Sequence, residues 1–160
     1  MDLRVFLESL RGARELIDIR EPLSLDYEVG ALCRKLSDAN GPAAILHRVG
    51  ESKAPLVVNV YGMRKRVAMA VGADEESLLT HVAQKLKSRI PTQLRKEGEA
   101  PCQEVVIAGD DVDILRWPFP LWNLGDAGRY ITAGNIIARH PEFGWNIAYH
   151  RAQLYNGKEL

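Results

Sequence analysis

The hydrophobic and polar positions of residues 1–112 follow the spacing of helices and of strands in turn. Apolar residues recur every three or four positions in stretches that predict helices, and alternate or run together in stretches that predict strands. The predicted helices cover residues 3–10, 29–36 and 78–86, and the predicted strands cover 15–19, 43–49, 56–61 and 105–108. Because nearly every residue of 56–61 is apolar, we expect this strand to be central in its sheet. The pattern indicates an α/β layer in which helices pack on a sheet.

Polar residues mark the ends of these predicted helices. Asp2 is placed to cap the first helix, with Gly12 at its end, and Asp26 opens the second. Acidic residues 74–76 precede the third helix, which suits the positive end of the helix dipole. The end of that helix carries the basic residues Lys85, Lys87 and Arg89. A further basic run, Arg64-Lys65-Arg66, is interpreted as the solvated face of a helix.

The pattern changes after the first 112 residues to that of a β-meander reached through a proline-rich linker. Two prolines within 117–123 exclude both a helix and a central strand there. Long strands are predicted at 130–139 and 145–155, with a hairpin loop at 140–144. Asn156-Gly157 is a strong hairpin signal, so a third strand is expected to begin at Lys158. Eight of the eleven aromatic residues lie in this second part, and we therefore divide the chain into domains 1–112 and 113–160.

Composition and charge narrow the classes of function. The chain has 21 Lys and Arg against 21 Asp and Glu, so its formal net charge is zero, which argues against nucleic-acid or anionic-membrane partners. No apolar run approaches the ~20 residues of a membrane helix, and the first twelve residues have no signal-peptide core. Cys33 and Cys102 fit neither a disulfide framework nor a zinc spacing, which favours the reducing cytoplasm.

Short blocks of distinctive sequence run in order along almost the whole chain. In the second part they are Gly109-Asp-Asp-Val-Asp113, Pro118-Phe-Pro120, Gly125-Asp-Ala-Gly-Arg-Tyr-Ile-Thr-Ala-Gly134 and Trp145-Asn-Ile-Ala-Tyr-His-Arg151. In the first part they are Asp2-Leu-Arg4, Glu15-Leu-Ile17, Asp26-Tyr-Glu-Val-Gly30 and Gly62-Met-Arg-Lys-Arg-Val-Ala-Met-Ala-Val-Gly72. Together these blocks resemble the UbiD family of decarboxylases, whose members are considerably longer. The resemblance implies an α/β fold: an N-terminal α/β domain of helices on a mixed sheet, then the first strands of an FMN-binding split β-barrel.

The resemblance also implies a chemistry, namely the reversible, non-oxidative decarboxylation of a small aromatic, heteroaromatic or α,β-unsaturated acid. It implies prenylated FMN (prFMN), made by a partner flavin prenyltransferase, and a divalent metal, Mn²⁺, with K⁺ as an option. Asn146 matches the family's metal ligand, and Arg151 matches the catalytic arginine beside the flavin. Tyr149, His150 and Arg151 fall in the stretch that contacts the cofactor. A homo-oligomer is also expected.

Each of these residues has a simpler structural interpretation as well. An Asn in a strand is usually solvated, His150 alone is more often satisfied within a strand than catalytic, and Arg151 could form an internal salt bridge. The aromatic residues of 117–122 are interpreted as core packing rather than as substrate contacts. Asn146 and Arg151 are separated by an odd number of positions, so a regular strand would place them on opposite faces. A shared site therefore requires a bulge, or the end of the strand, between them.

The family's further metal-binding carboxylate and its acidic proton donor have no counterpart in an equivalent motif of residues 1–160. Because general acid catalysis needs a donor within hydrogen-bond reach, we expect the chain to be inactive alone. It would be the N-terminal portion of a longer enzyme, or a partner chain would complete it. Two alternatives stay open: a non-catalytic α/β module for assembly or regulation that binds no flavin, and an ordinary FMN-binding split-barrel oxidoreductase.

Overall fold

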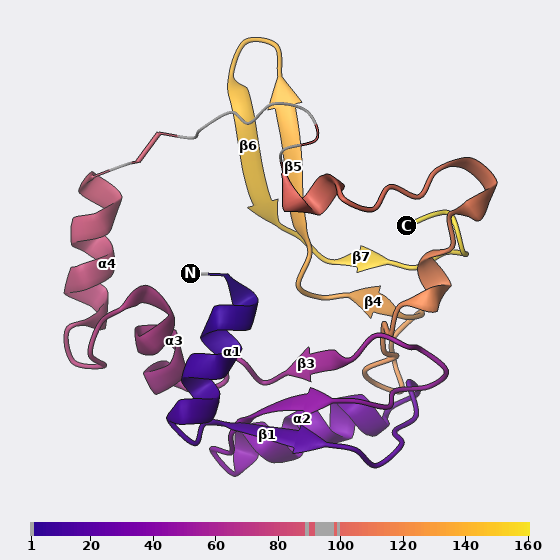
Figure 1. The fold of residues 1–160 in the computed structure, drawn as a ribbon, viewed down its shortest axis with the longest axis horizontal. Helices are drawn as coiled ribbons and strands as arrows, with labels where there is room; N and C mark the ends of the chain where they lie inside the picture. Colours follow the sequence, from indigo (N-terminus) through magenta and orange to yellow (C-terminus); the bar gives the residue numbers. More distant parts are fainter. Residues whose placement is uncertain (1, 89, 92–97, 99) are drawn as a thin grey trace.

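In the computed structural model, residues 2–88, 90–91, 98 and 100–160 are described. The helices are α1 (Leu3–Gly12), α2 (Glu28–Asp38), α3 (Arg64–Val71) and α4 (Leu78–Lys87). The strands are β1 (Leu16–Ile19), β2 (Ala43–Leu46), β3 (Leu56–Val58), β4 (Tyr130–Ile131), β5 (Asn135–His140), β6 (Gly144–Tyr149) and β7 (Ala152–Gln153). Helices α1, α2 and α3 lie beside the first three strands, α4 extends away from them, and the later strands form two ribbons (Figure 1). This mixture of helices and open sheets confirms the predicted fold class. Within the described ranges, no helix has the length and apolar character needed to cross a membrane.

The first sheet has the order β1-β2-β3, with β1 parallel and β3 antiparallel to β2. A buried cluster that includes Val29 packs α2 on one face of the sheet, and a second cluster that includes Phe6 packs α1 on the other. We call them the α2 cluster and the α1 cluster. The prediction that residues 56–61 form the central strand is wrong, because β2 lies in the centre. Their apolar run reflects burial on both faces instead: Val58 belongs to the α2 cluster and Val60 packs against the α1 cluster.

Helix α1 begins where its sequence predicts. Asp2 caps it by accepting a hydrogen bond from the Val5 amide at 3.0 Å. Near the other end of the helix, the guanidinium of Arg11 pairs with Asp18 on β1, and Nε2 of His47 lies 2.7 Å from the same carboxylate. The hydrogen bonds from Arg11, which has the larger effect, and from His47 lower the pKa of Asp18 to about 2. The end of α1 is thereby tied to the neighbouring strand at the surface.

Asp26 does not cap α2, which corrects the prediction. The N-cap position is Tyr27, at a φ of 71°, and no side chain of the described residues caps the helix there. The Tyr27 amide donates to the Leu121 carbonyl at 2.9 Å, so this segment pairs with the linker of the second part. Asp26 itself forms an ion pair with Arg129 at 3.1 Å. A residue type that suits a local cap is used here to join the two parts of the chain.

The start of α2 also makes a close backbone contact with the second part of the chain at Gly30. A Cβ built on Gly30 would collide with the carbonyl oxygen of Trp122, so only glycine allows this approach. The side chain of Trp122 packs against the α2 cluster. Core packing is therefore confirmed for Trp122. It is wrong for Trp117, which is exposed and lines a cleft.

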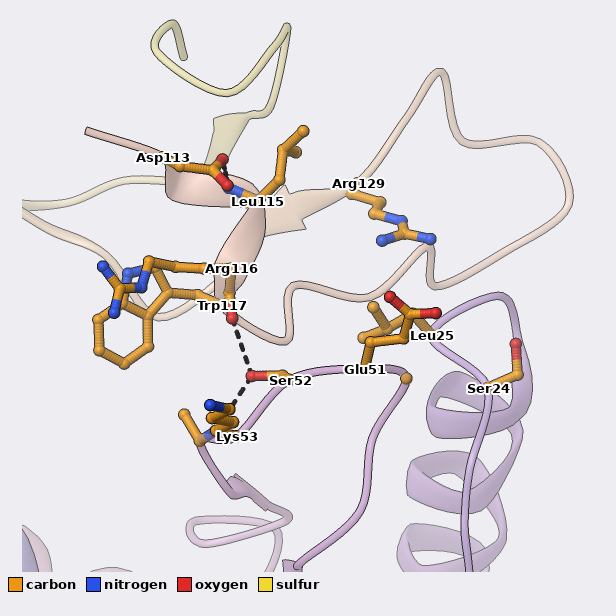
Figure 2. Close-up of a pocket in the computed structure, with 12 residues that line it drawn as sticks. Ser24, Leu25, Glu51, Ser52, Lys53, Asp113, Leu115, Arg116, Trp117 and Arg129 are labelled. Carbon is orange, nitrogen blue, oxygen red and sulfur yellow. Dashed lines mark hydrogen bonds between the residues drawn. The ribbon is translucent and has the colours of Figure 1, made fainter. Parts of the chain in front are cut away.

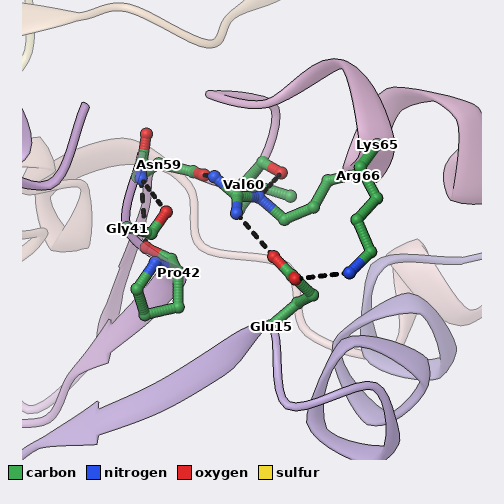
Figure 3. Close-up of polar contacts among 7 residues, drawn as sticks. All are labelled: Glu15, Gly41, Pro42, Asn59, Val60, Lys65 and Arg66. Carbon is green, nitrogen blue, oxygen red and sulfur yellow. Dashed lines mark hydrogen bonds and ion pairs between the residues drawn. The ribbon is translucent and has the colours of Figure 1, made fainter. Parts of the chain in front are cut away.

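Arg66 on α3 is buried, which corrects the interpretation of its basic run as a solvated face. Its relative exposure is 0%. Figure 3 shows the guanidinium between Glu15 and the chain that follows β3. Nη1 donates to Glu15 Oε2 at 2.8 Å, while Nε and Nη2 donate to the carbonyls of Val60 and Asn59 at 3.2 and 3.1 Å. Lys65 binds the other Glu15 oxygen at 2.8 Å, and Lys65 and Arg66 together lower the pKa of Glu15.

Residues 105–108 do not form the predicted strand. They lie between 3₁₀ turns at Pro101–Gln103 and Gly109–Asp111, and Val105 and Val106 are exposed. A strand needs a neighbour for its backbone hydrogen bonds, and no strand in the described part of the chain pairs with this segment. The apolar run therefore remains irregular. Of the basic residues predicted at the end of α4, Arg89 lies outside the described residues.

The second part folds as two antiparallel ribbons, in which β5 pairs with β6 and β4 pairs with β7. The strands predicted at 130–139 and 145–155 are thus present, but each is divided in two. The hairpin loop predicted at 140–144 is confirmed, because His140 pairs with Gly144 at the end of the β5–β6 ladder.

The strand predicted from Lys158 is not formed. The chain does fold back, because the Tyr155 amide donates to the Glu159 carbonyl at 3.0 Å. The Gly157 carbonyl, however, accepts from the Ile114 amide at 2.8 Å. The turn is tied to the linker and does not extend a ribbon.

Candidate active site

The two ribbons meet at a corner that carries residues predicted to contact a cofactor. Between the β4–β7 and β5–β6 ladders, three residues of one strand (132–134) face two residues of the other (150–151), which leaves one residue extra. This is the arrangement of a β-bulge, which bends a ribbon and increases its twist. The His150 amide donates to the Gly134 carbonyl at 2.9 Å, and a Cβ on Gly134 would lie 2.9 Å from the His150 carbonyl oxygen. The close crossing of the strands therefore requires glycine at position 134.

The predicted site residues lie on this corner and on the hairpin beside it. Asn146 lies within β6, paired with Ala138, and Tyr149 is the last residue of β6. His150 and Arg151 follow in the corner, outside both strands. Strand β6 therefore ends between Asn146 and Arg151, as a shared site of two residues an odd number of positions apart requires. All four predicted side chains are exposed, and no hydrogen bond joins Asn146 to Arg151 among the residues described.

The side chain of Arg151 lies on an aromatic ring. Its central guanidinium carbon is 5.9 Å from the centroid of the Tyr130 ring. No carboxylate pairs with Arg151 within the described ranges, so the internal salt bridge considered from the sequence is not found there. Its N–H groups can therefore bind an external carboxylate in a bidentate manner.

His150 is held by hydrogen bonds to the backbone. In addition to its amide, its Nδ1 makes a hydrogen bond with the Arg151 carbonyl at 2.9 Å, in which Nδ1 must carry the hydrogen because a carbonyl only accepts. The ring is therefore fixed beside the corner. The His150 side chain thus has a hydrogen-bond partner, as the simpler interpretation expects, although the residue lies between β6 and β7 and not within a strand.

The β5–β6 hairpin exposes large apolar side chains on both faces. One face carries Trp145, Ile147 and Tyr149, and the other includes Ile136. The guanidinium of Arg139 lies 5.5 Å from the Trp145 ring centroid. An exposed apolar surface of this kind is typical of a site that binds a ligand or packs against another protein segment.

A cleft of about 920 Å³ lies between the two parts of the chain, lined by Arg129 and by residues of 24–25, 50–54 and 113–117. Figure 2 shows Arg129 directed toward it, and the Ser52 hydroxyl joins its walls by donating to the Arg116 carbonyl at 2.9 Å. Side chains of both charges line the cleft. Tyr130, Arg151 and the other residues of the corner are not among the residues that line the cleft. The cleft and the corner are therefore separate.

Metal-binding capacity is limited in the described ranges. Groups of three or more His, Cys, Asp or Glu side chains that could hold a metal ion are absent there. Asn146 would therefore be a single ligand of a larger set. Sequence reasoning also missed Tyr130 and Gly134. Both lie in the block 125–134, but their roles follow from its register against 150–153, which residue spacing does not show.

The chain matches two domains of one protein family. Residues 7–86 match the N-terminal domain of 3-octaprenyl-4-hydroxybenzoate carboxy-lyase (UbiD_N). Residues 93–160 match the Rift-related domain of the same carboxy-lyase (UbiD). The two matches occur in the order expected from the sequence blocks.

Solved structures of UbiD-class enzymes have the same fold. An evolved dimeric form of HmfF from Pelotomaculum thermopropionicum, in complex with prFMN, is 30% identical with a TM-score of 0.89, and the match covers 97% of this chain and 36% of that chain. Vanillic acid decarboxylase from Sedimentibacter hydroxybenzoicus is 26% identical with a TM-score of 0.87, covering 98% and 36%. This chain thus spans little more than a third of the length of these proteins. The domain matches and the shared fold confirm the resemblance: the chain belongs to the UbiD family of carboxy-lyases.

Proposed function

We propose that this chain forms part of a prFMN-dependent carboxy-lyase that reversibly decarboxylates a small aromatic, heteroaromatic or α,β-unsaturated acid. The observation that carries the proposal is the exposed Arg151 guanidinium, which lies at the bulged corner without a carboxylate partner among the described residues. It falls within the region that matches the Rift-related domain. A guanidinium in this state can hold a substrate carboxylate through two parallel N–H···O bonds.

The chemistry of the corner and hairpin fits a flavin and a metal-bound phosphate. Asn146 has an exposed side-chain amide, whose oxygen is the hard type of ligand that Mn²⁺ shares with phosphate oxygens. The exposed side chain of Ile136, on the same face of the hairpin as Asn146, offers an apolar contact to a flat ring system. One amide oxygen does not complete the shell of a divalent ion, so further ligands must come from outside this set. HmfF has been solved with prFMN and with FMN, which supports the choice of cofactor.

Within this proposal, each residue of the chain has a limited task. When bound, prFMN supplies the electrophile that accepts the electron pair left on the unsaturated carbon by departing CO2. Arg151 binds and orients the carboxylate through its planar set of N–H donors. Asn146 helps to hold the metal that anchors the flavin phosphate. The proton that replaces CO2 requires an acidic donor within hydrogen-bond reach of the reacting carbon, and no residue of 1–160 is assigned that task.

The partners proposed follow from the same chemistry. A flavin prenyltransferase would supply the cofactor. The Sedimentibacter relative is a vanillic acid decarboxylase, which supports an aromatic acid as substrate. The HmfF relative was solved in a dimeric form, which supports a homo-oligomer.

The experiment uses the polypeptide that contains this chain, co-expressed with a flavin prenyltransferase, and follows exchange of ¹³CO2 into a panel of aromatic and unsaturated acids. Arg151→Ala should abolish exchange while the purified protein keeps its flavin absorbance. Asn146→Ala should lower the content of both flavin and metal. Arg34→Ala removes the same charge from an exposed position of α2 and should exchange at the wild-type rate. Exchange near the wild-type rate in Arg151→Ala would show that its catalytic assignment is wrong.

A further inference from the structure

We infer that Tyr130 is a positioning residue, which holds the Arg151 guanidinium at the corner by presenting the face of its ring. The inference rests on the proposed function for the role of Arg151 in substrate binding. The contact itself rests only on the geometry of the β4–β7 ribbon.

The register of the ribbon brings the two side chains together. Tyr130 on β4 pairs with Gln153 on β7, and Arg151 lies two residues before Gln153. Side chains of residues two apart along an extended strand lie on the same face, so Arg151 is the diagonal neighbour of Tyr130. Diagonal neighbours are within reach when one is aromatic and the other is long. The guanidinium carbon lies 5.9 Å from the ring centroid, within the range of a cation–π contact.

Tyr130 is itself held at its backbone and at its side-chain hydroxyl. The Tyr130 amide donates to the Pro120 carbonyl at 3.3 Å, and its hydroxyl donates to Gln153 Oε1 at 2.9 Å. The Gln153 amide in turn lies close over Gly128, where a Cβ would be 3.1 Å from Nε2. The preceding residue, Arg129, is anchored to the first part of the chain by its ion pair with Asp26. The ring is therefore a rigid support and not a mobile surface group.

An aromatic support leaves the charge of the arginine available. A carboxylate partner would fill the guanidinium N–H groups and compete with the carboxylate of a substrate. A ring face attracts the cation through its quadrupole and accepts no N–H bond in the guanidinium plane. Tyr130 can therefore restrict the rotamers of the exposed Arg151 side chain while its bidentate edge stays free. Asn146 and the metal are not needed for this restraint.

The contact can be tested by NMR on the 160-residue chain without cofactor. Wild-type protein should show nuclear Overhauser effects between the Tyr130 ring protons and the Arg151 δ protons, and the δ protons should be shifted upfield relative to those of exposed Arg34. Tyr130→Phe keeps the ring and should keep this shift. Tyr130→Leu should move the Arg151 signals to the position of Arg34. Tyr155→Leu, a control at an exposed tyrosine, should leave them unchanged.

Two results would overturn the inference. One is the absence of the ring-to-δ Overhauser effects in wild type, which needs no variant and is unaffected if Tyr130→Leu fails to fold. The other is an unchanged Arg151 shift in a folded Tyr130→Leu protein. In the polypeptide that has been co-expressed with a flavin prenyltransferase and has bound prFMN, Tyr130→Leu should raise the KM for the acid more than Tyr130→Phe does. If the NMR contact is present but Arg151→Ala still decarboxylates, the proposed function fails while the positioning contact stands.

Discussion

Replacement of Arg66 by Met tests how the first part of the chain is held together. Met fills much of the volume of the buried stem but removes the guanidinium. The Val60 carbonyl then loses its donor, whereas the Asn59 carbonyl keeps the hydrogen bond from the Gly62 amide at 3.3 Å. A buried carbonyl left without a donor costs about 1–3 kcal/mol. Glu15 keeps Lys65 as a partner, so its carboxylate is not left without a cation. The expected loss is therefore about 1–3 kcal/mol, the cost of the Val60 carbonyl that loses its donor.

This loss is large against the total stability of about 5–15 kcal/mol that is usual for a domain. Urea unfolding at pH 7, followed by far-UV circular dichroism, measures the difference from wild type. Lys65→Met is the matched control, because it removes the other cation of Glu15 from a side chain that is 48% exposed. That variant should lose only about 0–1 kcal/mol. A loss under about 1 kcal/mol in Arg66→Met, or an equal loss in both variants, would refute the reasoning from burial.

The remaining predictions concern a backbone contact, a surface carboxylate and the two thiols. Gly30→Ala should lower the free energy of unfolding by about 1–3 kcal/mol in urea titrations, because a Cβ at that position meets the backbone of Trp122. Gly12→Ala places its Cβ in open space and should not lower the free energy of unfolding. Equal losses in the two variants would contradict the close approach at Gly30. The pKa of Asp18 is lowered to about 2 in the folded state, so its carboxylate stabilises the protein above about pH 4 and progressively less as the pH falls toward 2. The difference in unfolding free energy between wild type and Asp18→Asn should therefore vanish over that interval, and a constant difference would be evidence against the ion pair. Burial raises the pKa of the Cys33 thiol to about 11, so a thiol reagent at pH 8 should label the exposed Cys102 before Cys33. Rapid labelling of Cys33 in a Cys102→Ser variant would contradict this prediction.

Elements whose ends are set by residues only a few positions away along the chain could be predicted from the sequence. Asp2 caps α1 as expected, because the amide it binds is three residues away. The hairpin loop at 140–144 is also confirmed, because two strands joined by a short loop pair with each other. In both cases the information lies within a few positions of the feature.

Features that depend on distant residues could not be predicted in this way. Asp26 is a suitable cap by type, yet it pairs with a residue 103 positions later in the chain. A basic run has the same sequence whether it is solvated or buried, and Arg66 is buried because Glu15, 51 positions earlier, lies against it. The 105–108 segment has the composition of a strand, but no strand of the described residues pairs with it.

The candidate site shows the same division. The family resemblance located Asn146 and Arg151, and the parity of their positions predicted a break in the strand between them. The extra residue of the bulge, however, lies on the facing strand at 132–134. The support from Tyr130 likewise follows from strand register, which no motif of the sequence specifies.

The central claim is that Arg151 acts in a decarboxylation that depends on prFMN. It is tested most directly by measuring ¹³CO2 exchange into an aromatic acid with the same polypeptide purified with and without a co-expressed flavin prenyltransferase. The account predicts exchange only in the co-expressed protein, and its loss in Arg151→Ala although flavin is still bound. Equal exchange in both preparations, or no exchange with any acid from protein that has prFMN bound, would contradict it.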